Sequence, residues 1–350
     1  MKSASLNKLA WTKLKKDNFS FFSLLFILAS FFVATFSVLI SPDSSRNANE
    51  MHLELKTMDP FSKVLFLKIP KKDVTKNNFF SSIFVGFNHN FERLPITSFI
   101  KIKGGVEFLQ YNHDVHKKYI GEYKIEEQVF WFGTDKYGRD FLSRILYGLR
   151  ISISVGLIAV IISLVIGISL GLVAGYYRGR VDNIIMWFVN VIWSIPTLLM
   201  VIAITLALGK GFWQVFIAVG LTMWVEVARI VRGQVLVIRE LEFVEAGKAL
   251  AYKPFRIIFK HILPNVVGPL IVISAANFSS AILIEAGLSF LGIGAQPPIP
   301  SWGNIIKENY NYIIMGKPFL AIIPGIAIMT LVLALMLLGN GLRDAFDVKN

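Results

Sequence analysis

Residues 241–265 read LEFVEAGKALAYKPFRIIFKHILPN, two short amphipathic helical patterns set between membrane-length apolar stretches. In the first pattern, apolar and small residues share one helical face: Phe243, Ala246, Gly247 and Leu250. In the second, Pro254 suits a first helical position, and an apolar stripe follows with Phe255, Ile258, Phe259 and Ile262. Small residues let a partner backbone come close, so we predict that another protein binds this loop. The alternative is a pair of amphipathic helices lying on the lipid surface.

The composition is that of a membrane protein. Of 350 residues, 54% are hydrophobic and 17% charged, and the mean hydropathy is +0.59. A spanning helix needs about 20 apolar residues, and six stretches are long enough: 19–40, 151–175, 184–208, 212–230, 264–286 and 319–342. The first is too long for the apolar part of a signal peptide, and 41–43 offers no small-residue cleavage site. The sequence predicts an all-α membrane protein with six transmembrane helices.

Lysine and arginine collect at the two termini and in alternate connections between the spans. They are Lys2, Lys8, Lys13, Lys15 and Lys16, then Arg178 and Arg180, then Arg229, Arg232, Arg239, Lys248, Lys253, Arg256 and Lys260, and finally Arg343 and Lys349. Because such residues mark cytoplasmic segments, both termini and the 241–265 loop are predicted to be cytoplasmic. The net charge of +13 then reflects topology and a basic outer segment, and no nucleic-acid partner is expected. With no cysteine, disulfides and cysteine-based metal sites are excluded.

The chain divides into a cytoplasmic N-terminus with the first span (1–40), an extracytoplasmic segment (41–149) and a five-helix core (150–350). Alternating stretches at 52–56, 64–69, 99–103 and 106–111 predict a small β-rich insertion between the first two spans. His113 and His116 are too few for a metal site and are interpreted as surface residues. In 132–144, Gly and Asp favour turns and a helix start, with Arg139, Arg144 and Arg150 anchoring an interfacial helix at the headgroups.

The loop quoted above resembles the EAA loop of ABC-importer permeases. Glu245-Ala246-Gly247 stands for the triplet, Ala251 where glycine is usual, and 262–265 reads ILPN. The resemblance implies that the cytoplasmic coupling loop, 233–263, docks into a cleft of a separate ATPase subunit. The coupling residues that it implies are Phe243, Glu245, Ala246, Gly247, Ala249, Leu250, Ala251 and Tyr252.

Four further stretches resemble one branch, the dipeptide, oligopeptide and nickel importers. They are GTDKYGRDFLSR (133–144), GLVAGYYRGRVD (171–182), GLSFLGIGAQPPIPSWG (287–303), and Pro324-Gly325 with GNGLRD (339–344). The resemblance covers about 130–347 and implies the C-type permease subunit with the type I importer permease fold. It also implies four kinds of partner: a B-type permease in a heterodimer, two ATPase subunits that bind ATP and Mg, an extracytoplasmic solute-binding protein, and membrane lipid. The chain departs from the family at Trp187 and Asn190, where Arg and Asp are common, and at Met336 and Asn340.

Four features lie within the predicted spans. Gly167, Gly171 and Gly175 form a GxxxGxxxG pattern that permits close helix packing, and Pro196 should kink the third span. Glu226, one turn before Arg229, is interpreted as its ion-pair partner at the inner interface. In the fifth span, a polar stripe lines the translocation path or forms interhelical hydrogen bonds; it comprises Ser274, Asn277, Ala281 and Glu285.

The sequence contains no phosphate-binding GxxxxGK[ST] motif and no catalytic or metal-ligand constellation in the spans. The chain is therefore predicted to be no enzyme and to carry no cofactor of its own. We expect the permease subunit of an ATP-driven oligopeptide importer in a bacterial cytoplasmic membrane. Nickel is the alternative within the branch, although the spans hold no His or Cys. A secondary transporter would need titratable residues at the bilayer midplane, and a membrane-bound enzyme would need a catalytic constellation.

Overall fold

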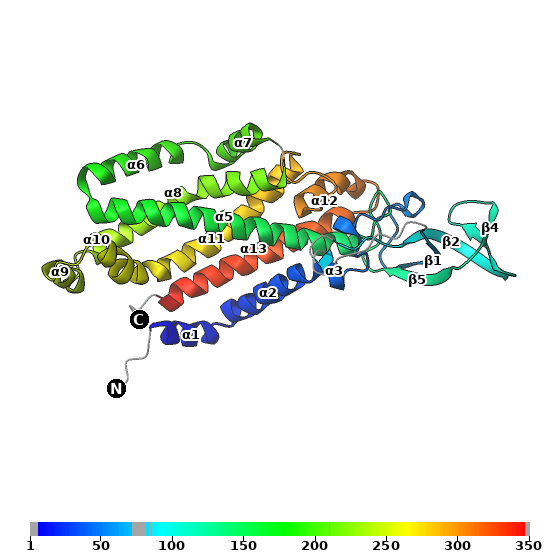
Figure 1. The fold of residues 1–350 in the computed structure, drawn as a ribbon, viewed down its shortest axis with the longest axis horizontal. Coiled ribbons are helices and arrows are strands. Elements are labelled where there is room, and N and C mark those ends of the chain that lie inside the picture. Colours follow the sequence, from blue (N-terminus) through cyan, green and yellow to red (C-terminus); the bar gives the residue numbers. More distant parts are fainter. Residues whose placement is uncertain (1–5, 72–81, 84–85, 210, 347–350) are drawn as a thin grey trace. The chain divides into compact units, whose positions relative to one another are not determined.

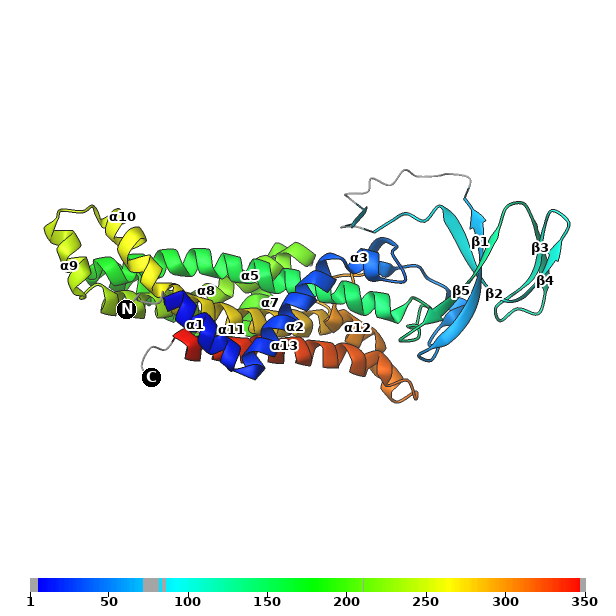
Figure 2. The ribbon, with the colours of Figure 1, turned by 90° about the horizontal axis from the view of Figure 1, so that it is seen from below.

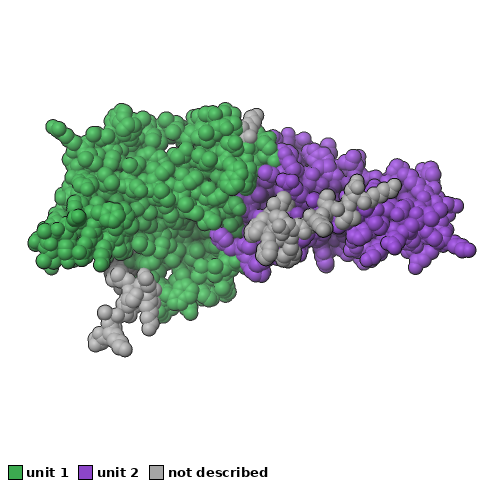
Figure 3. All heavy atoms as spheres, viewed as in Figure 1, with its two compact units in different colours: residues 1–30, 152–296, 327–350 green, residues 31–151, 297–326 purple. Residues whose placement is uncertain are grey.

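The computed structural model of the protein describes residues 6–71, 82–83, 86–209 and 211–346. Two compact units make up the chain (Figure 3): unit 1 holds residues 1–30, 152–296 and 327–350, and unit 2 holds 31–151 and 297–326. Lys2 and Lys349, which enter the argument on orientation, lie outside the described residues.

Helices dominate the fold (Figures 1 and 2). They are α1 (Leu6–Lys16), α2 (Asn18–Thr35), α5 (Phe141–Tyr177), α6 (Gly179–Trp193), α7 (Thr197–Leu208), α8 (Phe212–Ile238), α9 (Glu242–Ala249), α10 (Pro254–Arg256), α11 (Leu263–Phe290) and α13 (Phe319–Phe346). Over the described ranges, five helices are long and apolar enough to cross a membrane, and the bent pair α6 and α7 makes a sixth if counted as one span. The predicted helical membrane fold is confirmed, with five spans, or six when the bent pair is one span.

Small residues bring α5 and α8 together in unit 1. A Cβ atom added at Gly167 would lie 2.8 Å from the carbonyl oxygen of Trp224, and one at Gly171 would lie 2.7 Å from that of Ala228. Only glycine allows such an approach of one backbone to another. The GxxxGxxxG pattern therefore acts in packing, as predicted.

The third predicted span is broken. α6 ends at Trp193, α7 begins at Thr197, and the two helices meet at 90°. Pro196 occupies the N-cap position of α7, where its missing N–H does not interrupt a helical hydrogen bond. The predicted kink at Pro196 is confirmed, and it amounts to a right-angled break.

A five-stranded antiparallel sheet forms the main part of unit 2, with the strand order β4-β3-β2-β1-β5. The strands are β1 (Ser62–Pro70), β2 (Phe91–Ile102), β3 (Gly105–Gln110), β4 (His116–Ile120) and β5 (Lys124–Phe130). Alternate residues of β1 enter two cores: Val64 and Phe66 pack with Leu55 and Phe130, whereas Leu67 packs with β2 and β3 residues. The predicted β-rich insertion is confirmed.

One predicted strand is wrong, and two strands were missed. The 52–56 segment contains a 3-10 turn, Leu53–Leu55, because Leu55 is buried against the sheet rather than paired with a neighbouring strand. β4 and β5 escaped prediction because adjacent charged residues, Lys117-Lys118 and Glu126-Glu127, interrupt the alternation of apolar and polar positions. Unit 2 also includes α3 (Ser37–Ile40), a 3-10 turn at Arg46–Ala48, α12 (Trp302–Asn309) and a 3-10 turn at Tyr310–Ile313.

Candidate functional site: the α9–α10 loop

The loop between α8 and α11 is ordered by a helix-capping motif at the end of α9. Tyr252 donates its backbone N–H to the carbonyl of Gly247 at 3.0 Å, and Ala251 donates to that of Lys248 at 2.9 Å. These two bonds form a Schellman motif whose left-handed residue is Ala251, with φ of 57°. Glycine is usual here because an L side chain in this conformation costs about 1–2 kcal/mol. Ala251, which stands where the family usually has glycine, is therefore the one residue with a left-handed backbone in this loop.

The two sides of α9 face different surroundings. Val244 is fully buried in a hydrophobic cluster that includes Ile257 and Ile262, and Gly247 is also buried. Phe243 and Leu250, by contrast, are 41% and 66% exposed. Placing Gly247 on one face with Phe243 and Leu250 was wrong, because Val244 sets the inward face and Gly247 lies beside it, against the Tyr252 ring.

The remaining predicted coupling residues divide in the same way. Ala246, Ala249 and Glu245 are exposed with Phe243, Ala251 is exposed at the turn, and Tyr252 is half-buried. Glu245 lies in the first turn of α9 and Lys248 in the last, which suits the helix dipole.

The second segment splits its predicted stripe. A π-helical turn, Ile257–Ile262, follows α10 and rotates Ile258 and Ile262 into the core of unit 1. Phe255 and Phe259 stay 71% and 48% exposed, with their ring centroids 4.4 Å apart. The π-helical turn shifts the register, which a regular helical periodicity does not anticipate.

The exposed side chains form one candidate docking surface, which we call the apolar loop surface and define as Phe243, Leu250, Phe255 and Phe259. Phe243 is in α9, Leu250 is its C-cap, Phe255 is in α10 and Phe259 is in the π-helical turn. These elements lie at the end of unit 1 beyond α8 and α11 (Figures 1 and 2). Between α9 and α10, the Tyr252 ring contacts two side chains that stabilise the loop. The Arg256 guanidinium lies 3.9 Å from the Tyr252 ring centroid, and the His261 ring stacks on the Tyr252 ring with their centroids 5.9 Å apart.

The polar stripe of α11 lies inside the helical packing. Ala281 is fully buried, and Asn277 and Glu285 are 2% and 1% exposed. Glu285 accepts a hydrogen bond from Ser289 at 2.6 Å, and the partly buried Ser274 donates to the carbonyl of Leu270. Both hydrogen bonds lie within α11, so interhelical hydrogen bonding and a role of the stripe in the translocation path both stay predictions.

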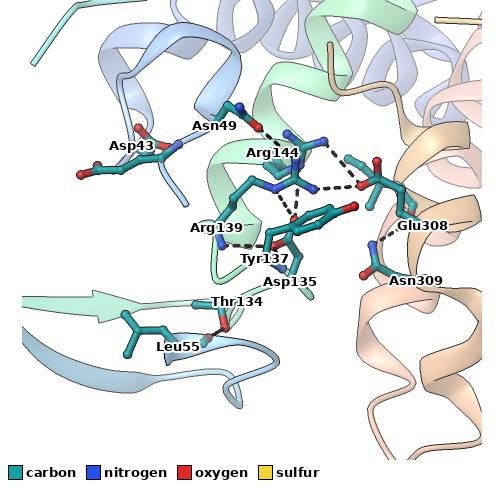
Figure 4. A network of polar contacts seen from close by, with 12 residues as sticks. Asp43, Asn49, Leu55, Thr134, Asp135, Tyr137, Arg139, Arg144, Glu308 and Asn309 are labelled. Carbon is teal, nitrogen blue, oxygen red and sulfur yellow. Dashed lines mark hydrogen bonds and ion pairs between the residues drawn. The ribbon is translucent and has the colours of Figure 1, made fainter. Parts of the chain in front are cut away.

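A buried charge network occupies the turn before α5 (Figure 4). The Arg139 guanidinium donates to Asp135 at 2.6 Å, Asn49 at 3.0 Å and Glu308 of α12 at 2.9 Å. Arg144 lies 3.7 Å from the same Asp135 carboxylate. Both arginines are 2% exposed, so interpreting Arg139 and Arg144 as headgroup anchors was wrong. Their carboxylate partners neutralise them inside the protein, and Glu308, far along the chain, could not be paired with them from sequence spacing.

A second polar cluster lies nearby in unit 2. Burial opposes the ionised form of Glu50, but the hydrogen bond from His52 and the charge of Arg93 bring the pKa of Glu50 down to about 2. Burial raises the pKa of Asp140 to about 6, against hydrogen bonds from Ser143. Ligand atoms of Asp43, Glu50 and His89 lie within 4.8 Å of one another, the spacing of a metal site. Arg93, at 2.8 Å from Glu50, already supplies the positive charge there.

Comparison with known proteins identifies the family. The model of the binding-protein-dependent transport system inner membrane component matches residues 167–349. A glutathione transport system permease protein of Pectobacterium atrosepticum is 42% identical over 219 residues, or 63% of this chain and 72% of the relative. For a dipeptide transport system permease protein of Alkalihalophilus pseudofirmus, the identity is 43% with the same coverage.

An oligopeptide transport system permease protein of Bacillus subtilis is 40% identical over the same length, covering 63% of this chain and 72% of the relative. Among solved structures, an inward-facing form of the MetNI methionine ABC transporter aligns at 17% identity with a TM-score of 0.49, covering 59% of this chain and 97% of that chain. From the family match and the sequence relatives, the chain belongs to the binding-protein-dependent transport system inner membrane components and is a multi-pass permease component of an ABC importer.

Proposed function

We propose that the chain is the C-type permease subunit of a peptide importer and forms the translocation path with a B-type permease. In this proposal, two ATPase subunits bind ATP and Mg on the cytoplasmic side, and an extracytoplasmic solute-binding protein delivers the peptide. The names of the three relatives support peptides as the substrate class and disfavour nickel. Membership in this family replaces the secondary-transporter and membrane-enzyme alternatives.

The observation that carries the proposal is the apolar loop surface. Its four large side chains are 41–71% exposed. Phe243 and Leu250 lie outside the helices that can span the membrane, and Phe255 and Phe259 lie near the start of the helical stretch Pro254–Phe290. Exposed apolar groups of this size, gathered together, are typical of a protein interface. We infer that they enter a cleft of the ATPase subunit, and that the buried Val244 and Gly247 keep α9 attached to the helices that move.

Orientation follows from charge. With both termini and the 233–263 loop cytoplasmic, 41–149 is extracytoplasmic and 150–350 forms the core that transmits the movement. The start of α1, the start of α6 and the end of α13 lie toward the same end of unit 1 as α9 (Figures 1 and 2), which supports this assignment.

Co-purification with the ATPase subunits and peptide uptake test the coupling surface. Leu250→Asp and Phe255→Asp each place a carboxylate where an apolar contact is expected, at a cost of several kcal/mol if the contact is dry. We expect the ATPases to be lost and uptake to collapse, while the amount of the chain in the membrane stays near normal.

Lys248→Ala is the matched control, since Lys248 is exposed on α9 and is not part of the apolar loop surface. It should retain both ATPases and uptake. If Leu250→Asp and Phe255→Asp keep their ATPases and transport normally, this surface does not couple ATP hydrolysis to transport.

A further inference from the structure

Glu226 lies deeper in its helix than the sequence indicated. α8 continues to Ile238, so Glu226 is at the middle of the helix rather than near its end. Six residues further on, Arg232 binds the Asp182 carboxylate in the first turn of α6, at 3.0 and 2.7 Å. At about 1.5 Å per residue, Glu226 stands about 9 Å from Arg232 along the axis and about 21 Å from Phe212. With the Arg232 pair at the inner headgroups, Glu226 falls at hydrocarbon depth.

Arg229 is not the partner of Glu226, so the predicted ion pair is wrong. The Arg229 guanidinium instead lies 3.8 Å from the centroid of the Trp193 ring at the end of α6. Within the described part of the chain, no basic side chain comes within 4.0 Å of the Glu226 carboxylate. Glu226 is exposed, and a carboxylate at this depth is costly unless it faces water or a polar ligand.

A cavity of about 340 Å³ lies next to Glu226, entirely within unit 1. The break between α6 and α7 forms one wall, and α8 and α11 form the others. Backbone groups freed by a helix break are tolerated at membrane depth where they line a water-filled cavity. The break and the unpaired carboxylate are independent observations, and both indicate that this cavity holds water or a ligand.

The lining favours a positively charged ligand over an anion. Besides Glu226 and the indole of Trp193, its polar side chains are hydroxyls, including Thr197 and Ser280. Met200 and Met223 add flexible apolar walls that adapt to different shapes. The volume is at the small end of ligand sites, of about 300–1,000 Å³, which suits one side chain of a peptide rather than a whole peptide.

We propose that this cavity is a subsite of the translocation path in which Glu226 binds a basic side chain, Lys or Arg, of the transported peptide. The inference rests on the proposed peptide-import function and adds a preference within it. Trp193 is a positioning residue: by holding the Arg229 guanidinium over its ring, it leaves the Glu226 carboxylate available to the substrate.

Uptake by the complete complex in proteoliposomes, with its solute-binding protein, tests the subsite. The probes are Ala-Lys-Ala and the neutral analogue Ala-norleucine-Ala, whose middle side chain has nearly the same length. The quantity compared is kcat/KM for the Lys peptide divided by kcat/KM for the norleucine peptide. We expect Glu226→Gln to lower this ratio by at least about tenfold, the low end for removing one member of a desolvated charge pair. Because both complexes use the same binding protein, its own preference cancels in the comparison.

Trp193→Leu provides a second variant. It should free Arg229 to pair with Glu226 and lower the same ratio, while import of the norleucine peptide continues. The inference would be overturned if Glu226→Gln lowered import of both peptides equally, as the loss of a structural ion pair with the second permease would. An unchanged ratio of Lys-peptide to norleucine-peptide import in both variants would overturn it as well. If the unmodified complex imports neither peptide, the proposed function itself fails, which separates the two failures.

Discussion

Replacing Arg139 with methionine tests whether the buried charge network stabilises unit 2. The guanidinium bonds Asp135, Asn49 and Glu308 through three nitrogens, and it stacks 4.5 Å from the Tyr137 ring centroid. Methionine fills much of the same volume but leaves Asp135 with backbone N–H donors and Arg144 at 3.7 Å.

The magnitude follows from burial. Arg139 and Asp135 are 2% and 1% exposed, and removing one partner of a buried ion pair typically costs about 3–5 kcal/mol. Because Arg144 and two N–H groups remain near Asp135, we expect the low end, about 3 kcal/mol. Arg139→Lys should recover little, since one ammonium group cannot reproduce three directed bonds.

The assay is unfolding of the purified chain in detergent, with hydrogen exchange of the 133–144 backbone as a local readout. Lys63→Met is the matched control: Lys63 pairs with Glu127 at 3.8 Å, but both side chains are more than half exposed. Its expected effect is below about 1 kcal/mol. If Arg139→Met proves as stable as Lys63→Met, with unchanged exchange, the network does not stabilise this unit.

Three further predictions concern stability, each measured by unfolding in detergent. Gly171→Ala should cost about 1–3 kcal/mol because its Cβ would meet a backbone carbonyl, whereas a Cβ at Gly233 meets nothing within 4 Å, so Gly233→Ala should not destabilise. Ala251→Gly should relieve its left-handed strain and match or exceed the original stability, whereas Ala249→Gly, inside α9, should cost about 0.5–1 kcal/mol; the reverse order would contradict the capping motif. The Asp140 pKa is raised from 3.8 to about 6, so protonated Asp140 stabilises the fold fully below pH 3.8, and this contribution is lost as the pH rises through 6. Asp140→Asn should abolish this loss, which is of the order of 3 kcal/mol. A pH profile of stability that the substitution leaves unchanged would refute the prediction.

Local patterns in the sequence were sufficient for much of the fold. The spans follow from apolar length, the close packing of α5 from glycines four residues apart, and the kink of the third span from Pro196. Each depends on a few neighbouring residues and on physics that acts along one helix. The alternating strands β1, β2 and β3 were found for the same reason.

Distant contacts account for what the sequence did not reveal. The predicted fourth span ended at residue 230, but α8 continues to Ile238, and Arg232 within it pairs with Asp182 of α6, so Glu226 lies at mid-helix. Arg139 seemed a surface anchor because its partner Glu308 is 169 residues away. In the candidate site, the docking role was predicted from residue types. The inward position of Gly247 depends on the burial of Val244, which helical periodicity alone does not specify.

Reconstituted import tests the central claim most directly. Labelled peptide, solute-binding protein and ATP are supplied to proteoliposomes that contain the B-type permease and ATPase subunits, with or without this chain. We predict ATP-dependent accumulation of peptide only when this chain is present, and no ATP hydrolysis by the purified chain alone. Equal accumulation without the chain, or ATP hydrolysis by the chain itself, would contradict its assignment as the permease of an ATP-driven peptide importer.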